Sequence, residues 1–448
     1  MSDLLGIGAS GVKAYQTALT TVSENIANAA TPGYAKRTAD LREVAPATGI
    51  SSGSRLAVGQ GVLASGITRS ADTLRAADVR NASADLARSD TSVEWLGRIQ
   101  TALTGNQLGD QLGSFFNAAK SVAADPTASA PRSTMLEQAK TVAGSFSATG
   151  TALDSLDTDL DTTATQAATT LTTLGAALAK VNDGLGRAQS GSSGAAQLAD
   201  QRDSILDQIS AISDVSVTTD AAGRASVKLG DAGGPALVVG NQAASVSFSR
   251  GTDGVIAFSL QGQNGATAVT ASGGALAGIA EAGTRIADAR KQLDAIATAF
   301  TSGVNAVQAQ GDDLSGTSGA PLFATGTSAT DISVALTDPN GIAAAAKGAG
   351  SRDTANLANL ATLRTTGAFE SKTTALVSNN AATLASRQQV ADAQGSIRDT
   401  AVAARDAVSG VNLDSEAVDL LRFQQAYSAS SRVIQVARDT FQSILDIR

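Results

Sequence analysis

The chain has 448 residues, with 33 basic and 41 acidic side chains and a net charge of −8. It contains no Cys and no His, which excludes disulfide bonds, metal sites built from either residue, and catalysis by a Ser–His or Cys–His pair. The acidic balance argues against a general nucleic-acid-binding protein, and no apolar run approaches the roughly 18 residues that would predict membrane insertion.

The N-terminal segment is expected to form a helix that ends in a turn. Its apolar residues recur at intervals of three and four, which places them on one helix face: Val12, Tyr15, Leu19, Val22 and Ile26. Pro32 and Gly33 then end the helix and start the turn. A Gly-rich segment follows, in which we expect a loop with short strands at about 40–70.

Helical spacing returns at 73–214, with a connection between helices marked by Pro126 and Pro131. Short alternating apolar runs separated by Gly residues then predict a small β-rich region of five to seven strands at 215–274. Helical spacing resumes over 275–399, apart from a Gly-rich loop and a short strand expected at 332–334.

The C-terminal segment, 400–448, carries the most regular pattern. Apolar residues recur at every seventh position, which is typical of a coiled-coil seam: Leu413, Leu420, Tyr427, Ile434 and Phe441. Because both ends of the chain carry such a seam, we expect the two terminal helices to pair with each other.

These patterns predict a mainly α protein with a small β insertion. Residues 1–72 and 400–448 would form a coiled-coil stem, and residues 73–214 and 275–399 would form a long, rod-like helical bundle. Residues 215–274 would form a β-rich outer domain at the tip far from the stem. Because aromatic residues make up only 3% of the chain, the core is expected to consist largely of Ala, Leu, Val and Ile.

Three short motifs match catalytic or ligand-binding patterns. Residues 6–11 match G-x-G-x-x-G, but no strand precedes them, which favours close helix packing. Residues 49–53 match G-x-S-x-G, but a nucleophile elbow needs a His that the chain lacks. Asp157, Asp159 and Asp161 match the start of a calcium loop whose later ligands are missing, which favours a solvated helix face. We therefore predict no catalytic, cofactor or metal site.

The two terminal seams allow two interpretations. They can form an ordinary core within one chain, or they can form an assembly surface that copies of the chain complete for one another. Two paired helices bury little by themselves, which supports assembly, but periodicity alone favours neither interpretation.

Residues 25–34, Asn-Ile-Ala-Asn-Ala-Ala-Thr-Pro-Gly-Tyr, resemble the N-terminal signature of bacterial flagellar axial proteins. A C-terminal run narrows the resemblance to the FlgK family of the hook–filament junction. It comprises residues 411–417, 421–427 and 431–434. Internal segments that resemble the same family lie at 115–117, 198–203, 273–278 and 319–323.

The resemblance implies a structural protein of the bacterial flagellum and not an enzyme. Such a protein assembles with copies of itself as a ring at the hook tip, between the flagellar hook protein and a second hook-associated junction protein on the filament side. The resemblance also implies an extracellular location, export through the flagellar type III apparatus without a cleaved signal peptide, and a cytoplasmic export chaperone.

The assembly interface is then expected on the two terminal segments. In the N-terminal segment it comprises Val12, Tyr15, Leu19, Val22, Ile26, Asn28, Thr31, Gly33 and Tyr34. In the C-terminal segment it comprises Leu413, Leu420, Leu421, Phe423, Gln424, Tyr427, Ile434 and Phe441.

Two other functions remain as alternatives. The nearer one is another flagellar axial protein, a hook or distal rod subunit, because these share the terminal signatures. The more distant one is a secreted surface enzyme or adhesin. Paired carboxylates can cleave glycosidic bonds without His, but sugar sites usually use aromatic platforms, and the chain has a single Trp, Trp95.

Overall fold

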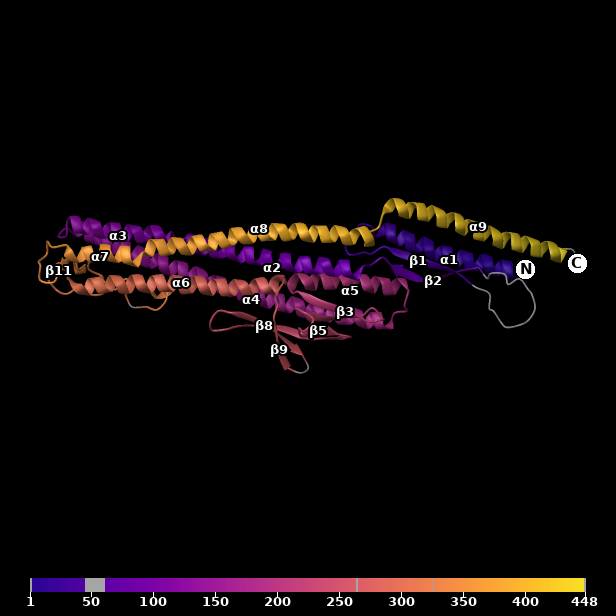
Figure 1. Ribbon diagram of the computed structural model, residues 1–448, viewed down its shortest axis with the longest axis horizontal. Helices are drawn as coiled ribbons and strands as arrows, with labels where there is room; N and C mark the ends of the chain where they lie inside the picture. The colour runs from indigo at the N-terminus through magenta and orange to yellow at the C-terminus, as the bar shows by residue number, and fades with distance from the viewer. Residues whose placement is uncertain (1, 45–60, 263–264, 325, 447–448) are drawn as a thin grey trace.

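The computed structural model describes residues 2–44, 61–262, 265–324 and 326–446. The molecule is elongated, with both termini at one end and a long helical body extending away from them (Figure 1). We call the end with the termini the stem; it contains α1 (Ser2–Ala27), β1 (Arg37–Glu43), β2 (Val62–Arg69) and α9 (Leu413–Asp446). We call the body between β2 and α9 the rod.

The rod consists of long helices that run back and forth between the stem and the far end. Two lead outward, α2 (Thr73–Thr104) and α3 (Leu108–Ala124), and α4 (Ser129–Arg187) returns. Two more lead outward, α5 (Ser193–Ile212) and α6 (Gly274–Gln310), before α7 (Ala355–Gly367) and α8 (Phe369–Ser409) return. Short elements close the far end: β10 (Gly311–Asp312), η1 (Ala329–Asp331), η2 (Pro339–Gly341) and β11 (Ala345–Ala346).

Local sequence explains where these helices begin. Asp72 precedes α2, and its side chain accepts hydrogen bonds from the backbone N–H groups of Leu74 and Arg75. Ser192 caps α5 in the same way. The connection predicted at Pro126 and Pro131 is shorter than expected, because α4 begins at Ser129 and includes Pro131. Proline is tolerated there because the backbone N–H groups of the first helical turn have no intrahelical partner.

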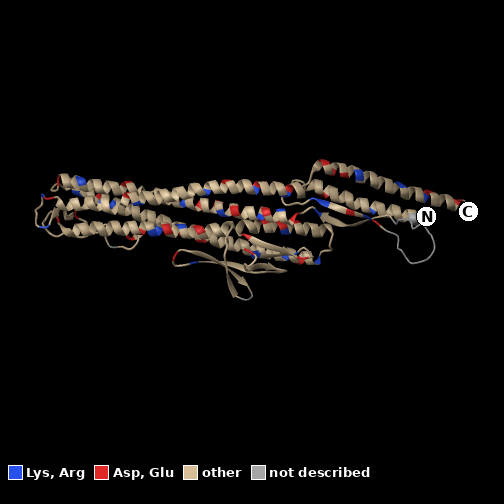
Figure 2. Cartoon of the chain, viewed as in Figure 1, with Lys and Arg blue, Asp and Glu red and all other residues tan. Residues whose placement is uncertain are grey.

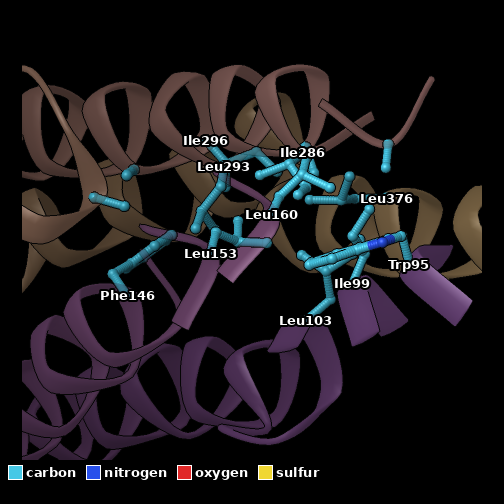
Figure 3. Close-up of a cluster of buried hydrophobic side chains, with 14 of the residues drawn as sticks. Trp95, Ile99, Leu103, Phe146, Leu153, Leu160, Ile286, Leu293, Ile296 and Leu376 are labelled. Carbon is cyan, nitrogen blue, oxygen red and sulfur yellow. The ribbon is translucent and has the colours of Figure 1, made fainter. Parts of the chain in front are cut away.

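The helices pack around one continuous apolar core. Figure 3 shows side chains of α2, α4, α6 and α8 converging in it, among them Trp95, Leu153, Leu293 and Leu376. The same buried cluster includes one face of the β-rich region, such as Val227 and Phe258. Burial of this surface is the main favourable term in the stability of the rod.

Aromatic side chains are rare in the chain, but they are concentrated in this core. Six of the ten Phe residues form one contact cluster toward the far end: Phe115, Phe116, Phe146, Phe300, Phe323 and Phe369. The core as a whole is still largely Ala, Leu, Val and Ile, as expected, and the Phe cluster is a local exception within it. Composition alone carries no information on where a few large side chains gather.

The β-rich region contains seven strands in its described residues, arranged as two antiparallel sheets. One sheet has the order β3-β4-β5-β6, formed by Val215–Thr219, Ala225–Leu229, Ala236–Val239 and Gln242–Ala243. The other has the order β7-β8-β9, formed by Ser245–Arg250, Ile256–Gly262 and Gly265–Val269. A mainly α fold with a β insertion is thus confirmed.

The position of this insertion differs from the expected one. It lies on the flank of the rod beside α4 and α5, and not at the far tip (Figure 1). Helix lengths explain the difference: α4 has 59 residues, whereas α5 has 20 and α6 has 37. At about 1.5 Å per residue, α5 and α6 together span the length of α4, so the insertion between them begins partway along the rod.

Polar contacts hold the insertion along α4. Asn182, fully buried, donates from Nδ2 to the carbonyls of Ala225 and Gly240, each at 2.7 Å. Arg250 of β7 pairs with Asp157 at 2.8 Å and with Asp161. The interpretation of these two aspartates as a solvated helix face is therefore wrong, because they anchor a strand.

Two further expectations concern short segments. The strand predicted at 332–334 is wrong, because the only pairing there in the described residues is a single bridge between Phe323 and Val334. The G-x-S-x-G match at 49–53 lies outside the residues that the structure describes.

Candidate assembly interface

The stem is an antiparallel pair of helices, α1 and α9, with the β1–β2 hairpin packed against α1. Gly8 lies opposite Ile434, Gly11 opposite Ser430, and Tyr15 opposite Phe423, with ring centroids 6.4 Å apart. The pairing of the terminal helices predicted from the two seams is confirmed.

Glycine residues allow this close approach. A Cβ atom on Gly8 would lie 2.7 Å from Cγ1 of Ile434, and one on Gly11 would lie 2.6 Å from Oγ of Ser430. The same addition at Gly6 meets nothing within 4 Å. The G-x-G-x-x-G match is therefore a packing feature of the stem.

Gly8→Val is expected to weaken the pairing of α1 with α9 by about 1–3 kcal/mol, because the added side chain overlaps Ile434. Gly6→Val is the matched control, since it makes the same change in helix propensity without the overlap. Hydrogen exchange of α9 amides should be about tenfold faster in Gly8→Val and unchanged in Gly6→Val. Equal exchange in the two variants would contradict this role of Gly8.

The predicted interface residues of α1 face α9 to different degrees. Val22 is buried, whereas Val12, Tyr15, Leu19 and Ile26 are half-buried. The most buried positions of α1 are smaller or polar residues: Gly8, Gly11, Ala14, Ala18, Thr21 and Asn25. Seam prediction missed these residues because it searched for large apolar side chains.

The seven-residue seam of α9 is buried only in its middle. Leu420, Tyr427 and Ile434 are half-buried, whereas Leu413 and Phe441 are about half exposed. Phe423, which is not part of the seam, is also half-buried. Glu416 lies opposite Asn25 and Ile434 opposite Gly8, so Leu413 and Phe441 lie just beyond the two ends of α1. The seam is longer than its partner, because α9 has 34 residues and α1 has 26.

Large apolar side chains are exposed at several places on the described part of the stem, including Leu63 on β2 and Leu413 and Val433 on α9. The others form two groups. On α9, Val418, Leu421 and Val436 are 66%, 59% and 63% exposed. We call these three residues the outer face, because they lie on the side of α9 away from α1. At the end that carries the termini, the exposed residues are Leu4, Leu5, Phe441, Ile444 and Leu445. Contiguous exposed apolar surface is a recognised feature of protein–protein contact sites.

At the end of the stem that adjoins the rod, polar residues form a hydrogen-bonded network. Asn25 is fully buried; its Nδ2 donates to Glu416 Oε2 and to the Arg37 carbonyl, each at 2.8 Å. Its Oδ1 accepts from the Arg37 N–H at 3.0 Å and from the Tyr34 hydroxyl at 2.8 Å. Lys36 Nζ lies 2.8 Å from the buried Glu416 carboxylate. This network joins α1, β1 and α9.

The turn after α1 contains the other predicted residues. Gly33 has φ +79°, a left-handed conformation that a side chain disfavours. Asn28 is half-buried, Thr31 and Gly33 are exposed, and the Tyr34 ring lies 4.8 Å from the Arg37 guanidinium carbon. Leu421 and Gln424 are exposed on α9, away from this turn, so the structure does not bring all the predicted residues together.

Burial raises the pKa of Tyr34 from 10.0 to about 12, with Arg37 acting in the opposite direction. Because the pKa in the folded state is higher, the contribution of protonated Tyr34 to stability is complete below pH 10 and is lost as the pH rises toward about 12. Alkaline titration of tyrosinate absorbance in wild type and Tyr34→Phe should differ by one transition near pH 12. A difference centred at pH 10 would contradict this environment.

Basic and acidic residues lie close together where the stem meets the rod (Figure 2), and several of them form ion pairs. Asp200 of α5 accepts from Arg37 Nη2 at 2.7 Å and from Arg69 Nε at 2.8 Å. Arg69 Nη2 also donates to Asp203 at 2.8 Å. We call Arg37, Arg69, Asp200 and Asp203 the joint cluster. Burial alone would lower the pKa of Arg37, but its hydrogen bond to Asp200 and its acidic neighbours raise it.

Asp207, one turn further along α5, links two rod helices. It lies 3.0 Å from Arg405 of α8 and 3.9 Å from Arg80 of α2. Burial raises the pKa of Asp207, against the two arginines, and burial lowers the pKa of Arg80. Sequence reasoning missed these acidic residues as a group, although their spacing, at 200, 203 and 207, places them on one helix face.

The described residues contain no group of acidic side chains arranged to hold a metal ion. In the described part of the chain, no helix is long and apolar enough to cross a membrane. The stem therefore carries exposed apolar side chains, and ion pairs connect the stem to the rod.

Comparison with known proteins gives three family matches. Residues 96–323, just over half of the chain, match the flagellar hook-associated protein FlgK helical domain. Residues 406–447 match the C-terminal region of the flagellar basal body rod FlgEFG proteins, and residues 5–34 match the flagella basal body rod protein family.

Individual relatives agree with these matches. Flagellar hook-associated protein 1 of Salmonella typhimurium is 25% identical over 337 residues, which cover 73% of this chain and 60% of the relative. The Escherichia coli protein of the same name is 24% identical over the same shares. The structure of the hook junction protein FlgK from Burkholderia pseudomallei matches 56% of this chain and 47% of its own, with 25% identity and a TM-score of 0.51. The chain thus spans about 60% of the length of these curated relatives.

Proposed function

The chain belongs to the FlgK family, and from that premise we propose that it is a structural subunit of the bacterial flagellum, placed at the hook–filament junction. The observation that carries the proposal is the match of residues 96–323 to the FlgK helical domain. This match separates the chain from hook and distal rod subunits, because the two terminal matches concern segments that rod proteins share.

Assembly would take place through the stem. The outer face of α9 and the exposed apolar end of the stem present surface that the described residues of the chain leave exposed. Neighbouring copies in a ring at the hook tip would bury it. The interface would include the residues predicted from the sequence that are exposed, such as Leu413, Leu421, Gln424 and Phe441. Half-buried residues such as Leu420 and Ile434 would support it from beneath by positioning α9.

Partners follow from this position. Besides copies of itself, the protein would contact the hook protein on one side and a second hook-associated protein on the filament side. Before export, a cytoplasmic chaperone would cover the apolar surface of α9. The protein would leave the cell through the flagellar export apparatus without a cleaved signal peptide and would reside outside the cell.

The role is structural and involves no catalysis. The relatives are named for their place in the flagellum, and carboxylates such as Asp157, Asp200 and Asp72 serve in ion pairs and helix caps. A surface enzyme or adhesin remains the more distant alternative, and no observation of the site favours it.

Immunogold labelling of isolated flagella tests the proposal. The protein would be expressed in a bacterium that lacks its own hook-associated protein 1. We expect a narrow band of label between hook and filament, together with restored filament attachment. Label distributed along the hook would favour a hook subunit, and label on the cell envelope would favour the surface enzyme or adhesin.

A further inference from the structure

The stem and the rod have separate apolar cores. In the described residues, the buried apolar side chains of the stem are Ala14, Ala18, Val22, Ala35 and Ala437, and none of them belongs to the continuous core of the rod. The β-rich insertion differs, because nine of its buried residues belong to that core: Ala225, Val227, Leu229, Leu237, Val238, Val246, Ile256, Phe258 and Leu260. Apolar packing therefore holds the insertion on the rod but does not hold the stem.

Few backbone contacts connect the stem with the rod in the described part of the chain. The chain passes between them at 70–72 and at 410–412. Near these connections, the Lys36 N–H donates to the Ser409 carbonyl at 2.8 Å, and the Ile67 N–H donates to the Gly191 carbonyl at 2.7 Å. Two short connections with few cross-contacts allow one body to turn relative to the other.

The space around these connections is incompletely filled. A cavity of about 70 Å³ lies between the hairpin, α5 and α8, lined by polar groups that include Arg69, Asp203, Asp207 and Arg405. Close-packed interiors resist displacement, so a polar cavity at the meeting point leaves room for movement.

We propose that the joint cluster is a latch that holds the stem at one angle to the rod, and that the two connections form a hinge about which the stem turns when the latch opens. Asp200 is the centre of the latch, because its two oxygens bind Arg37 of β1 and Arg69 of β2. Both arginines belong to the stem hairpin, so loss of this one carboxylate removes two of the three ion pairs between the hairpin and α5 in the described residues and leaves only Arg69–Asp203. The latch follows from the contacts of a single chain and does not depend on the proposed place in the flagellum.

Latch strength follows from the environment of these side chains. Arg37, Arg69 and Asp200 are 8%, 12% and 14% exposed, so solvent and salt screen their interactions less than those of surface ion pairs. Removing Asp200 leaves Arg37 paired with Glu24 of α1 and Arg69 paired with Asp203, so both arginines stay partly buried with one ion pair fewer. Movement of the two side chains into water relieves the cost of the lost pairs. Opening of the hinge provides that movement.

The absence of Cys makes a direct measurement possible, because introduced cysteines are the only labelling sites. Spin labels at Ser396→Cys on α8 and Ser428→Cys on α9 report the distance between rod and stem by double electron–electron resonance. Both positions lie on helices, where a small polar side chain is replaced by another of similar size. Labels at Ser155→Cys and Ser396→Cys, both on the rod, provide the control distance.

The full-length chain should show one narrow stem–rod distance. In Asp200→Asn we expect that distribution to broaden or split, while the distance within the rod stays unchanged. Asp183→Asn is the matched control, since it removes a carboxylate from an exposed pair with Arg187 on α4. Arg69→Met is a second test, because it removes the contacts to both Asp200 and Asp203.

Three results would overturn the latch. A stem–rod distribution as narrow in Asp200→Asn and Arg69→Met as in wild type would show that other contacts hold the angle. Equal broadening in Asp183→Asn would show that the effect is not specific to the joint. Loss of stem helix by circular dichroism in both latch variants would show that the cluster is needed for folding of the stem and not for its angle.

Discussion

Replacing Leu421 and Val436 together by Glu is expected to abolish incorporation of the protein into the flagellum and, with it, filament attachment and motility. Both side chains lie on the outer face of α9 and do not pack against α1; Leu421 is 59% exposed and Val436 is 63% exposed. In an assembled ring each copy would bury two unpaired carboxylates, and burial of an unpaired charge costs several kcal/mol. Swimming in soft agar and electron microscopy of isolated hooks measure the loss.

The stem itself should survive this double substitution. Circular dichroism and thermal melting of the purified monomer are expected to match wild type, because exposed positions tolerate charge. Leu420→Glu should behave differently, since Leu420 is half-buried on the side that faces α1 and a charge there would separate the two helices before assembly. The two outer-face substitutions thus test assembly without testing folding.

Leu74→Glu is the matched control for the outer face. Leu74 is 76% exposed on α2 of the rod and receives the same change from an apolar to an acidic side chain. We expect it to assemble and to support motility. If Leu74→Glu and the outer-face variant lose assembly equally, the stem is not the specific contact surface.

Phe300→Ala is expected to destabilise the rod by about 3–5 kcal/mol, because it empties the centre of the aromatic cluster. Phe300 is fully buried on α6, and its ring centroid lies 5.3–5.4 Å from those of Phe115, Phe323 and Phe369. Removing the ring leaves a cavity bordered by α3, α8 and the far-end loops. Denaturant unfolding followed by the fluorescence of Trp95, the only Trp in the chain and buried in the same core, measures the change.

Phe441→Ala is the control for Phe300→Ala. Phe441 is 52% exposed at the end of the stem, so its truncation should change rod stability by less than about 0.5 kcal/mol. The same variant should assemble less well if the exposed end of the stem is buried in the ring. A loss below about 1 kcal/mol in Phe300→Ala would show that the aromatic cluster repacks around the gap.

The joint cluster was predicted from the sequence only in part. Residues 198–203 resemble a family segment, but their role as partners of the hairpin was not predictable. Arg37 and Asp200 are 163 residues apart in the chain, and ion pairing between them depends on where the stem and α5 end in space. Periodicity describes one element at a time and contains no information on such a contact.

The sequence by itself determined the kinds of element and the pairing of the two ends. Apolar spacing of three to four residues acts within a helix and alternation acts within a strand, so the long helices, the β-rich insertion and the terminal seams could be predicted locally. The family signatures in 25–34 and 411–434 were equally local. Each of these features depends on residues close together in the chain.

Only the tertiary structure decided how those elements combine. The insertion lies on the flank because the lengths of α5 and α6 add up to about that of α4. Leu421 faces outward and Leu420 inward because α9 meets α1 along one side only. Six Phe residues from distant segments form one cluster, while the stem shares no apolar core with the rod in the described residues. The physical reason is common to all four: burial depends on which surfaces meet, and that depends on the lengths and ends of elements far apart in the sequence.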